Sequence, residues 1–406
     1  MRYILIILLA FTSLSAQSQI SFKDSSWTWT AMLAEAKKND QLIFVDAYAV
    51  WCGPCKWMTK NVFGVKEVAS LYNRNFVNAY IDMEKGEGIT LRQKYNVRAY
   101  PTYLFINGDG EVVHRVVGST DTAKFIQHGL DALSPVRNLQ YLQRNYAANQ
   151  KDYNYVLSYL KALSAAYETK EAGNIALEYL NAQGPAAWIE KSNWTVLKDF
   201  TTDASSAPFL YLVNNAGDFS KRYDAKEVEP KIYQTFLAWP QQYISYPDKG
   251  KAVLDEKGYR DFQQKLKASK YPAKEEVLAK ADLTIYFATK EWRKYAKVVN
   301  HMLATKLIPM TIVGGDWLYS YGQNVNRFVE DQEVVAEATS WAKLISTNIP
   351  DLKPQQKVLY LDLYASLLEK KGDKALAANV RKDLDKEKVE AAKRSTGFMP
   401  MKLISN

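Results

Sequence analysis

The stretch VDAYAVWCGPCKWM, residues 45–58, constrains this chain of 406 residues more than any other. It holds both cysteines of the chain, Cys52 and Cys55, with Gly53 and Pro54 between them. The nearly continuous apolar run before the pair is typical of a strand that is buried on both faces. A helical pattern follows, so the sequence predicts that the two thiols lie where a buried strand ends and a helix begins.

That position favours thiol chemistry. The thiolate is the attacking species, and a helix N-terminus stabilises it through its dipole and its free N–H groups. We expect Cys52 to be exposed and to point toward those amides, with Cys55 one turn further in. Pro54 suits the first helical turn because its missing N–H has no partner there. Gly53 leaves the approach to the sulfur uncrowded.

Asp46 lies inside the same apolar run, six residues before Cys52. A buried carboxylate is costly unless its pKa rises or it finds a partner. Two interpretations remain open at this point. Asp46 is either a proton acceptor and donor for the thiol of Cys55 or a hydrogen-bonded structural residue.

Other roles for the pair fit the sequence less well. A bridge across two residues closes a very small loop, so its value for stability is low. A zinc site usually needs four protein ligands, and the chain has no second CxxC pair. The three histidines, His114, His128 and His301, are scattered along the chain, which disfavours both a metal site and cysteine-protease chemistry.

The N-terminus predicts export. Arg2 precedes an apolar run, and small and polar residues follow, a pattern typical of a secretory signal peptide over residues 1–18. The run is short for a membrane span, although an uncleaved anchor is the alternative. We expect a mature protein that is exported to the periplasm without stable membrane insertion. The net charge of +9 comes without a strong Lys/Arg run, so nucleic-acid binding is disfavoured.

Residues 19–134 have the pattern of an α/β domain. A helix, a buried strand, a helix interrupted near Gly64, a second strand, a hairpin and a closing helix are predicted, in order, at residues 26–38, 41–50, 56–75, 76–83, 100–118 and 121–133. Parallel strands joined by a helix, followed by a hairpin, predict a mixed central sheet covered by helices.

Four features of this domain resemble the thioredoxin superfamily. They are Asp46, the WCGPCK motif at residues 51–56, the Tyr-Pro-Thr at residues 100–102, and Gly118 after the last strand. The wider segment is most similar to the exported branch, and it resembles the periplasmic C-terminal domain of the disulfide reductase DsbD. The resemblance covers about residues 20–134, under a third of the chain.

The resemblance implies a role for each matching residue. Cys52 is the nucleophile, Cys55 the resolving cysteine and Asp46 the buried acid/base, while Pro101 follows a cis peptide bond beside the sulfurs. The residues implied to support the site are Trp51, Gly53, Pro54, Lys56, Tyr100, Pro101 and Thr102. No cofactor is implied beyond the redox-active cysteine pair.

Three departures from the family pattern stand out. Asn78 occupies the position that corresponds to a lysine near the buried aspartate of thioredoxin, so Asp46 is expected to titrate differently. Tyr100 is bulkier than the residue usual before the proline, and it either narrows the peptide groove or offers a hydroxyl near Cys52. The polar loop at residues 83–88 has no clear counterpart in thioredoxin.

Residues 135–406 read as an all-α domain that begins after Ser134. Helix pairs with small residues at packing positions resemble tetratricopeptide-type repeats, and one step of 34 residues runs from Trp341 to Ala375. The period does not continue through residues 140–330, and the stretches 201–224 and 308–322 read as irregular. We therefore expect an irregular, repeat-like helical domain.

The sequence favours an exported thiol–disulfide oxidoreductase, with a Gly-Pro dipeptide that resembles reducing thioredoxins. Protein disulfides are the expected substrates, and a reductant in an oxidising compartment needs a membrane electron donor. Two alternatives stay open: a net disulfide oxidase or isomerase, and a helical binding or assembly protein whose thioredoxin-like domain only captures partners. The helical domain would recruit or restrict partners in the leading interpretation.

Overall fold

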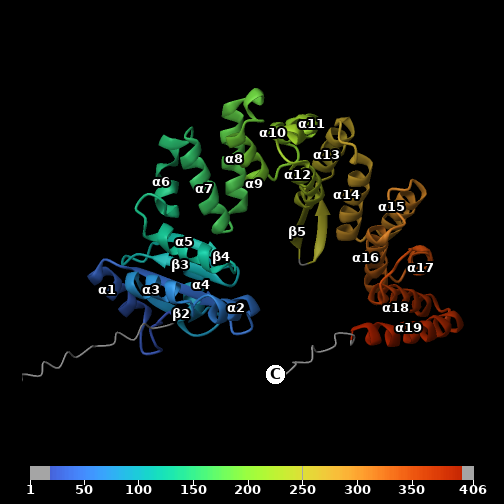
Figure 1. Ribbon diagram of the computed structural model, residues 1–406, viewed down its shortest axis with the longest axis horizontal. Helices are drawn as coiled ribbons and strands as arrows, with labels where there is room; N and C mark the ends of the chain where they lie inside the picture. The colour runs from blue at the N-terminus through green and yellow to red at the C-terminus, as the bar shows by residue number, and fades with distance from the viewer. Residues whose placement is uncertain (1–18, 249, 396–406) are drawn as a thin grey trace, which may run out of the picture. The chain divides into compact units, whose positions relative to one another are not determined.

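A computed structural model describes residues 19–248 and 250–395. The predicted signal peptide, residues 1–18, lies outside the described residues. The chain divides into two compact units, residues 1–202 and residues 203–406, which we describe separately (Figure 1). The fold class predicted from the sequence is confirmed in both parts: a mixed sheet with helices comes first, and a helical region follows.

The first unit is built around a four-stranded mixed sheet. Its strands are β1 (Leu42–Tyr48), β2 (Phe76–Asp82), β3 (Thr102–Ile106) and β4 (Val112–Val117). The strand order is β2-β1-β3-β4; β1 and β2 are parallel, and β3 is antiparallel to both β1 and β4. The two central strands, β1 and β3, are almost entirely buried, as their continuous apolar runs predict.

Helices cover both faces of the sheet. They are α1 (Trp29–Asn39), α2 (Gly53–Asn61), α3 (Lys66–Asn75), α4 (Glu87–Lys94) and α5 (Thr122–Leu133). Successive residues of a strand point to opposite faces, so Val45 packs with α1 and α4 while Phe44 packs with α2, α3 and α5. The predicted interruption of the second helix near Gly64 is confirmed, because α2 and α3 are separate helices.

Phe44 is the centre of an aromatic core on the second face. The Phe44 ring centroid lies 4.7 Å from that of Tyr72, 5.5 Å from Phe105 and 6.0 Å from Phe125. Tyr72 also stacks on Phe125, and its hydroxyl donates a hydrogen bond to the Phe125 carbonyl oxygen at 3.0 Å. These contacts join β1, β3, α3 and α5, so the strand that leads to the cysteines is held firmly.

The segment after β2 is ordered rather than a simple polar loop. The carboxylate of Asp82 accepts the main-chain N–H of Glu84 at 3.1 Å, and Gly86 adopts a φ of +52°. Glu87 accepts the N–H of Trp29 at the start of α1, at 3.1 Å. The helix α4 that follows was not predicted, because its residues lack amphipathic periodicity.

The first unit also includes four helices that follow the sheet: α6 (Leu139–Asn149), α7 (Tyr153–Ala165), α8 (Thr169–Gln183) and α9 (Lys191–Phe200). His114 on β4 is buried, and its Nδ1 accepts the Leu139 N–H of α6 at 3.1 Å. Burial lowers the pKa of His114 to about 4, which keeps this acceptor neutral. The domain boundary at residues 134–135 stays a prediction, since the helices directly after it pack against β4.

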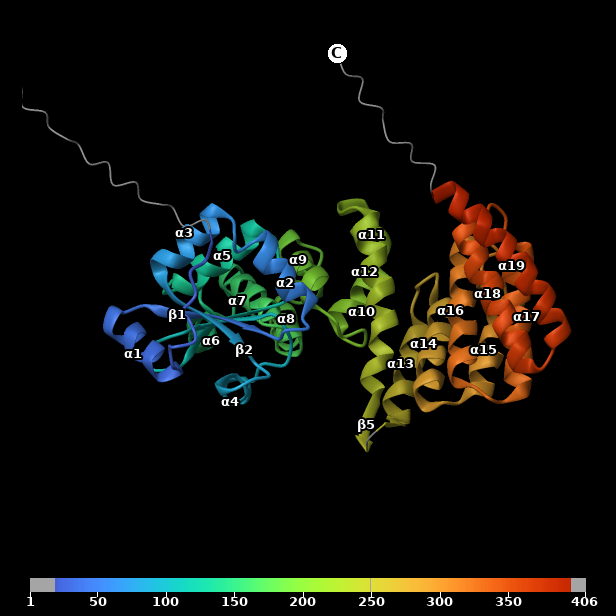
Figure 2. The same cartoon turned by 90° about the horizontal axis from the view of Figure 1, so that it is seen from below.

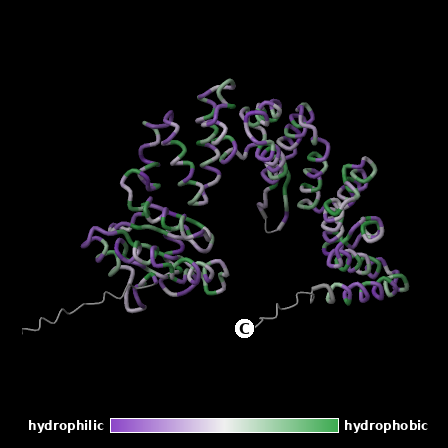
Figure 3. Tube along the Cα trace, viewed as in Figure 1, coloured by the Kyte–Doolittle hydropathy of each residue, from purple (hydrophilic) through white to green (hydrophobic). Residues whose placement is uncertain are grey.

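The second unit is mostly helical. Its elements are α10 (Ala207–Asn214), α11 (Ala216–Arg222), α12 (Ala225–Ala238), a short 3-10 helix (Trp239–Tyr243), β5 (Ile244–Asp248), β6 (Lys251–Leu254), α13 (Glu256–Ala268), α14 (Lys274–Thr289), α15 (Trp292–Ala304), α16 (Ile312–Phe328), α17 (Gln332–Asn348), α18 (Pro354–Lys371) and α19 (Lys374–Ser395). Neighbouring helices from α14 to α19 lie side by side (Figure 2), and polar and apolar residues alternate along them (Figure 3). No helix in residues 19–248 and 250–395 is both long and apolar enough to cross a bilayer.

One expectation for this part was partly wrong, and one was confirmed. The stretches 201–224 and 308–322 were expected to be irregular; residues 201–206 and 308–311 do lie outside helices, but residues 207–214, 216–222 and 312–322 form α10, α11 and the start of α16. The β5–β6 hairpin was not predicted at all. The turn at Gly372 between the last two helices is confirmed, with a φ of +92° at the end of α18.

Gly88 provides a test of the ordered segment after β2. A Cβ atom at this position would lie 2.0 Å from the main-chain oxygen of Asp82, so the segment must shift in Gly88→Ala. We expect the free energy of unfolding of the first unit to fall by about 1–3 kcal/mol, measured by denaturant unfolding followed through a signal from that unit.

Gly173→Ala is the matched control, because it lies in α8 of the same unit and an added Cβ would make only ordinary contacts. It is expected to be neutral or to stabilise by up to about 1 kcal/mol. Equal effects of the two substitutions would contradict the close approach at Gly88.

Candidate active site

The two cysteines lie where the sequence predicts, between the end of β1 and the start of α2. They are joined by a disulfide bond. Cys52 is the N-cap residue of α2, and its Sγ accepts the main-chain N–H of Cys55 at 3.1 Å. Pro54 occupies the first turn, and a Cβ at Gly53 would meet nothing within 4 Å. The amide that contacts Cys52 would stabilise a thiolate there after reduction.

The expectation that Cys52 is exposed was wrong. Only 2% of Cys52 and 1% of Cys55 is accessible to solvent in this disulfide form. Tyr48 and Tyr100 pack against the two cysteines and Ala49. The bulk of Tyr100, which the sequence places before Pro101, therefore narrows the approach to the sulfurs.

Main-chain contacts hold the segment around Pro101. The Tyr100–Pro101 peptide bond is cis, as the resemblance implies. Gly118, with a φ of +94°, donates its N–H to the Pro101 carbonyl oxygen at 2.8 Å. Thr102 is buried, and its hydroxyl donates to the Ala99 carbonyl oxygen at 2.7 Å. Gly118 and Thr102 thus fix the backbone on either side of the proline.

The Trp51 side chain lies exposed beside the cysteines. Its ring is 67% exposed and meets Tyr100 edge-on, with 5.9 Å between the ring centroids. The indole N–H donates to Oε2 of Glu84 at 2.9 Å, and the Arg92 guanidinium lies 5.8 Å from the Tyr100 ring centroid. Glu84 was not identified as a site residue from the sequence. The only signal for it was the additional polar loop at residues 83–88.

Asp46 is fully buried on β1, and neither of its carboxylate oxygens has a hydrogen-bond partner in the described structure. Burial raises the pKa of Asp46 to about 8. Its neighbours in the sheet register are Tyr80 on β2 and Tyr103 on β3. The carboxyl group is therefore protonated at neutral pH, and the interpretation as a hydrogen-bonded structural residue does not fit these contacts.

Asn78 does not replace the missing lysine at Asp46. Asn78 lies opposite Phe44, two register positions from the residue opposite Asp46. Its amide nitrogen lies within hydrogen-bond distance of the main-chain oxygens of Ser21 (3.3 Å) and Tyr72 (3.4 Å). No cationic side chain therefore shifts the pKa of Asp46, and the desolvation of its carboxyl group is the dominant effect.

A groove runs beside the start of α2, with a cavity volume of about 520 Å³. Its lining residues come from α2 and from the segment before α5: Gly53, Pro54, Trp57, Ser119, Thr120 and Asp121. Trp57 is 48% exposed, so this groove offers an apolar surface next to the cysteines. Lys56 is exposed on the same helix.

The histidines are less scattered than the sequence suggested. The rings of His114 and His128 lie 6.5 Å apart, on β4 and α5. Within residues 19–248 and 250–395, no group of His, Cys, Asp and Glu side chains is arranged to hold a metal ion.

A family model described as a thioredoxin-like domain matches residues 29–133. Among curated relatives, thioredoxin H4 of Arabidopsis thaliana is 31% identical over 103 residues, which cover 25% of this chain and 82% of the relative. Thioredoxin-1 of Drosophila melanogaster is 43% identical over 68 residues, 17% of this chain and 59% of the relative. The thiol:disulfide interchange protein DsbD of Yersinia pestis is 36% identical over 101 residues, 24% of this chain and 17% of the relative.

Among solved structures, a putative disulphide-isomerase from Bacteroides thetaiotaomicron is 45% identical in sequence. The match covers 29% of this chain and 95% of that chain, with a TM-score of 0.27. This chain thus spans 59% of the Drosophila thioredoxin and 17% of DsbD, and the similarities lie in its N-terminal part. Through residues 29–133, the chain belongs to the thioredoxin-like family.

Proposed function

We propose that this protein is an exported thiol–disulfide oxidoreductase that reduces disulfide bonds in other proteins. The observation that carries the proposal is the Cys52–Cys55 disulfide at the N-terminus of α2, with the buried Asp46 on the preceding strand. The names of the relatives, thioredoxin and thiol:disulfide interchange protein, support the same chemistry.

The reaction starts from the reduced dithiol. The Cys52 thiolate attacks one sulfur of a substrate disulfide, the substrate S–S bond breaks, and a mixed disulfide forms while one substrate thiolate leaves. Cys55 then loses its proton and attacks Sγ of Cys52, which releases the second substrate thiolate. Two electrons pass from the cysteine pair to the substrate, and the pair ends as the disulfide seen in the structure.

Asp46 handles the proton of Cys55 in this scheme. With its pKa near 8, the carboxyl group exchanges a proton readily at slightly alkaline pH. Because Asp46 is buried beside Tyr80 and Tyr103, bulk water does not solvate its carboxylate and does not stabilise the negative charge. The ionised fraction of Asp46 accepts the Cys55 proton as the resolving attack begins. In the reverse direction the Cys52–Cys55 disulfide is reduced, and the protonated carboxyl group gives its proton to the leaving Cys55 thiolate.

The reducing direction rests on the Gly-Pro dipeptide between the cysteines. A reductant in an oxidising compartment must be reduced again after each turnover, so we propose a membrane protein as electron donor. Export itself rests on the predicted signal peptide. No cofactor beyond the cysteine pair is needed for this scheme, and the helical part of the chain would recruit or restrict partners.

Covalent trapping tests the proposed function. In Cys55→Ser, the mixed disulfide on Cys52 cannot resolve, so substrate proteins should accumulate as adducts that a reducing gel removes. The wild type should reduce insulin with dithiothreitol as the electron source, and Cys52→Ser should lose at least about 100-fold of that activity.

The Cys52→Ser/Cys55→Ser double variant separates this function from a pure binding protein. It should form no adducts, and full insulin reduction by Cys52→Ser would contradict the proposal.

A measured equilibrium redox potential decides between the reductant and the oxidase or isomerase alternatives. A potential near that of thioredoxin, about −270 mV, is expected for a reductant.

The buried carboxyl group predicts an unusual pH dependence of stability. The unfolded chain loses the Asp46 proton near pH 3.8, whereas the folded protein keeps it to about pH 8. The folded state therefore binds more protons between these values, so Asp46 stabilises the fold at low pH and its contribution is lost as the pH rises to 8. The slope from this residue is about −1.4 kcal/mol per pH unit.

Asp46→Asn should remove that slope, so the oxidised variant should become more stable than the wild type above pH 7. Denaturant unfolding at several pH values measures the difference, and parallel curves of unfolding free energy against pH for the two proteins would contradict a raised pKa of Asp46.

Asp46→Asn should also slow the resolving attack of Cys55 and flatten the pH dependence of its rate, as read from the lifetime of the mixed disulfide.

A further inference from the structure

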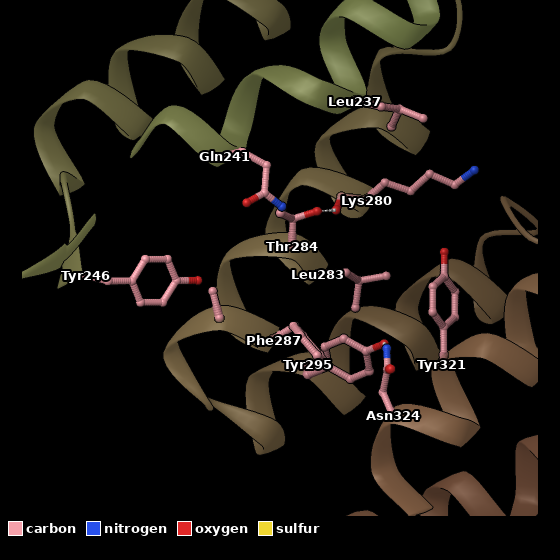
Figure 4. A pocket seen from close by; sticks show the side chains of 11 residues that line it. Leu237, Gln241, Tyr246, Lys280, Leu283, Thr284, Phe287, Tyr295, Tyr321 and Asn324 are labelled. Carbon is pink, nitrogen blue, oxygen red and sulfur yellow. Dashed lines mark hydrogen bonds between the residues drawn. The ribbon is translucent and has the colours of Figure 1, made fainter. Parts of the chain in front are cut away.

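A second cavity, far along the chain from the cysteines, lies within the second unit. It has a volume of about 520 Å³ and is bordered by the β5 strand and the helices α12, α14, α15 and α16. Tyr246, Leu283, Phe287, Tyr295 and Tyr321 give it a largely aromatic and aliphatic lining (Figure 4). A cavity of this size holds several side chains or a medium-sized ligand.

The cavity presents no net charge to a ligand. Lys280 is the charged residue of its lining, and its ammonium group is already engaged. Its Nζ lies 2.9 Å from the Glu276 carboxylate, 2.6 Å from the Tyr233 hydroxyl and 3.1 Å from the Trp317 ring centroid. Figure 4 shows the Lys280 side chain extending away from Gln241 and Thr284. An anionic or cationic ligand would therefore be desolvated without a charged partner.

Two side-chain amides supply the polar contacts. Asn324 donates its amide N–H to the Tyr295 hydroxyl at 3.1 Å, which leaves its oxygen as an acceptor. Gln241 is exposed at the edge of the cavity, and it offers both a donor and an acceptor. Donor–acceptor pairs of this kind match the N–H and C=O groups of a peptide main chain.

The apolar surface continues beyond the cavity. Phe287 is 39% exposed at its edge, and its ring centroid lies 5.6 Å from Trp292 and 5.8 Å from Phe328. Phe328 and Tyr246 are each more than half exposed. Large exposed aromatic side chains that lie together usually mark an interaction site, and an aromatic surface that continues past one cavity favours an elongated ligand.

The hairpin next to the cavity has open strand edges. In the described part of the second unit, β5 pairs with β6 and with no other strand, so each strand has one edge without a partner strand; β6 also contacts α14. Tyr246 belongs to β5 and lines the cavity. An extended polypeptide can bind such an edge through its main chain and place alternate side chains in an adjoining pocket.

We propose that this cavity and the β5 edge bind an extended, uncharged, apolar segment of a partner polypeptide. The neutral lining, the amide pair, the row of exposed aromatic rings and the open strand edge each favour that occupant over a small charged molecule. The partner class rests on the proposed function: such segments are exposed by incompletely folded proteins that carry disulfides. Binding them tethers disulfide-carrying proteins to the chain that holds the cysteine pair, so their effective concentration for exchange rises.

Peptide binding to a protein that comprises residues 19–406 tests the site directly. The probe is a fluorescein-labelled 12-residue peptide of Ala, Leu, Phe, Tyr, Gln and Ser, with no charge and no cysteine, followed by anisotropy. The Tyr246→Ser/Phe287→Ser variant should bind it at least about 10-fold more weakly than the wild type, because both side chains are exposed aromatic contacts.

Leu359→Ser/Val389→Ser is the matched control. These residues are 47% and 55% exposed on α18 and α19 of the same unit, outside the cavity, and their replacement should leave binding unchanged. A peptide of the same length with alternating Asp and Lys should bind at least about 10-fold more weakly than the neutral probe. Equal binding of the neutral probe by both double variants, or equal binding of the two peptides by the wild type, would overturn the proposal.

Enzymatic assays separate this inference from the proposed function. With scrambled ribonuclease as substrate, Tyr246→Ser/Phe287→Ser should lose about 5-fold or more in kcat/KM, while reduction of oxidised glutathione should not change. A wild type that reduces both disulfides but does not bind the neutral peptide refutes the binding site and leaves the oxidoreductase intact. A wild type that binds the peptide but reduces neither substrate refutes the oxidoreductase and supports the site.

Discussion

Burial of β1 on both of its faces is the constraint on which the rest of the first unit depends. The strand lies between β2 and β3, so its side chains alternate between two separate hydrophobic clusters. Phe44 anchors one cluster, and Val45 belongs to the other. A strand fixed in this way delivers the start of α2 to a defined place at the edge of the sheet. It also forces Asp46 into an environment where a negative charge is expensive.

The chemistry of the site follows from that constraint. A helix N-terminus next to a buried strand supplies the N–H that contacts Cys52, while the same strand supplies a proton-binding group without a counter-ion. Segments from elsewhere complete the surroundings: Tyr100 covers the sulfurs, and Glu84 holds the Trp51 indole. The positions of Cys52 and Asp46 are thus set by local geometry, whereas the shape of the approach is set by distant parts of the chain.

The sequence predicts the elements with strong periodicity and the residues of a recognisable motif. The strands β1 to β4, the helix interruption near Gly64 and the place of Cys52 and Cys55 at the start of α2 are of this kind. Prediction from the sequence fails where contacts between residues distant in the chain decide the structure. Cys52 is buried because Tyr100, remote in sequence, packs on it.

The start of α16 lies in the stretch 308–322, which was expected to be irregular. Gly314 and Gly315 of this stretch lie inside the helix. Added Cβ atoms there would come within 1.9 Å of the Pro309 main-chain oxygen and 2.8 Å of the Tyr360 hydroxyl. The glycines thus permit close packing rather than interrupt the helix, and no single-sequence pattern distinguishes these two uses.

The cover that Tyr48 and Tyr100 place over the sulfur atoms has a consequence for the rate of thiol–disulfide exchange. Small oxidants and low-molecular-weight disulfides react with thiols according to access as much as to driving force. A cysteine pair with about 2% or less of its surface open, flanked by Trp51, reacts with such molecules more slowly than an exposed pair would in this conformation. Access to the two sulfur atoms in this disulfide form therefore depends on the positions of Tyr48 and Tyr100, which lie outside the cysteine motif itself.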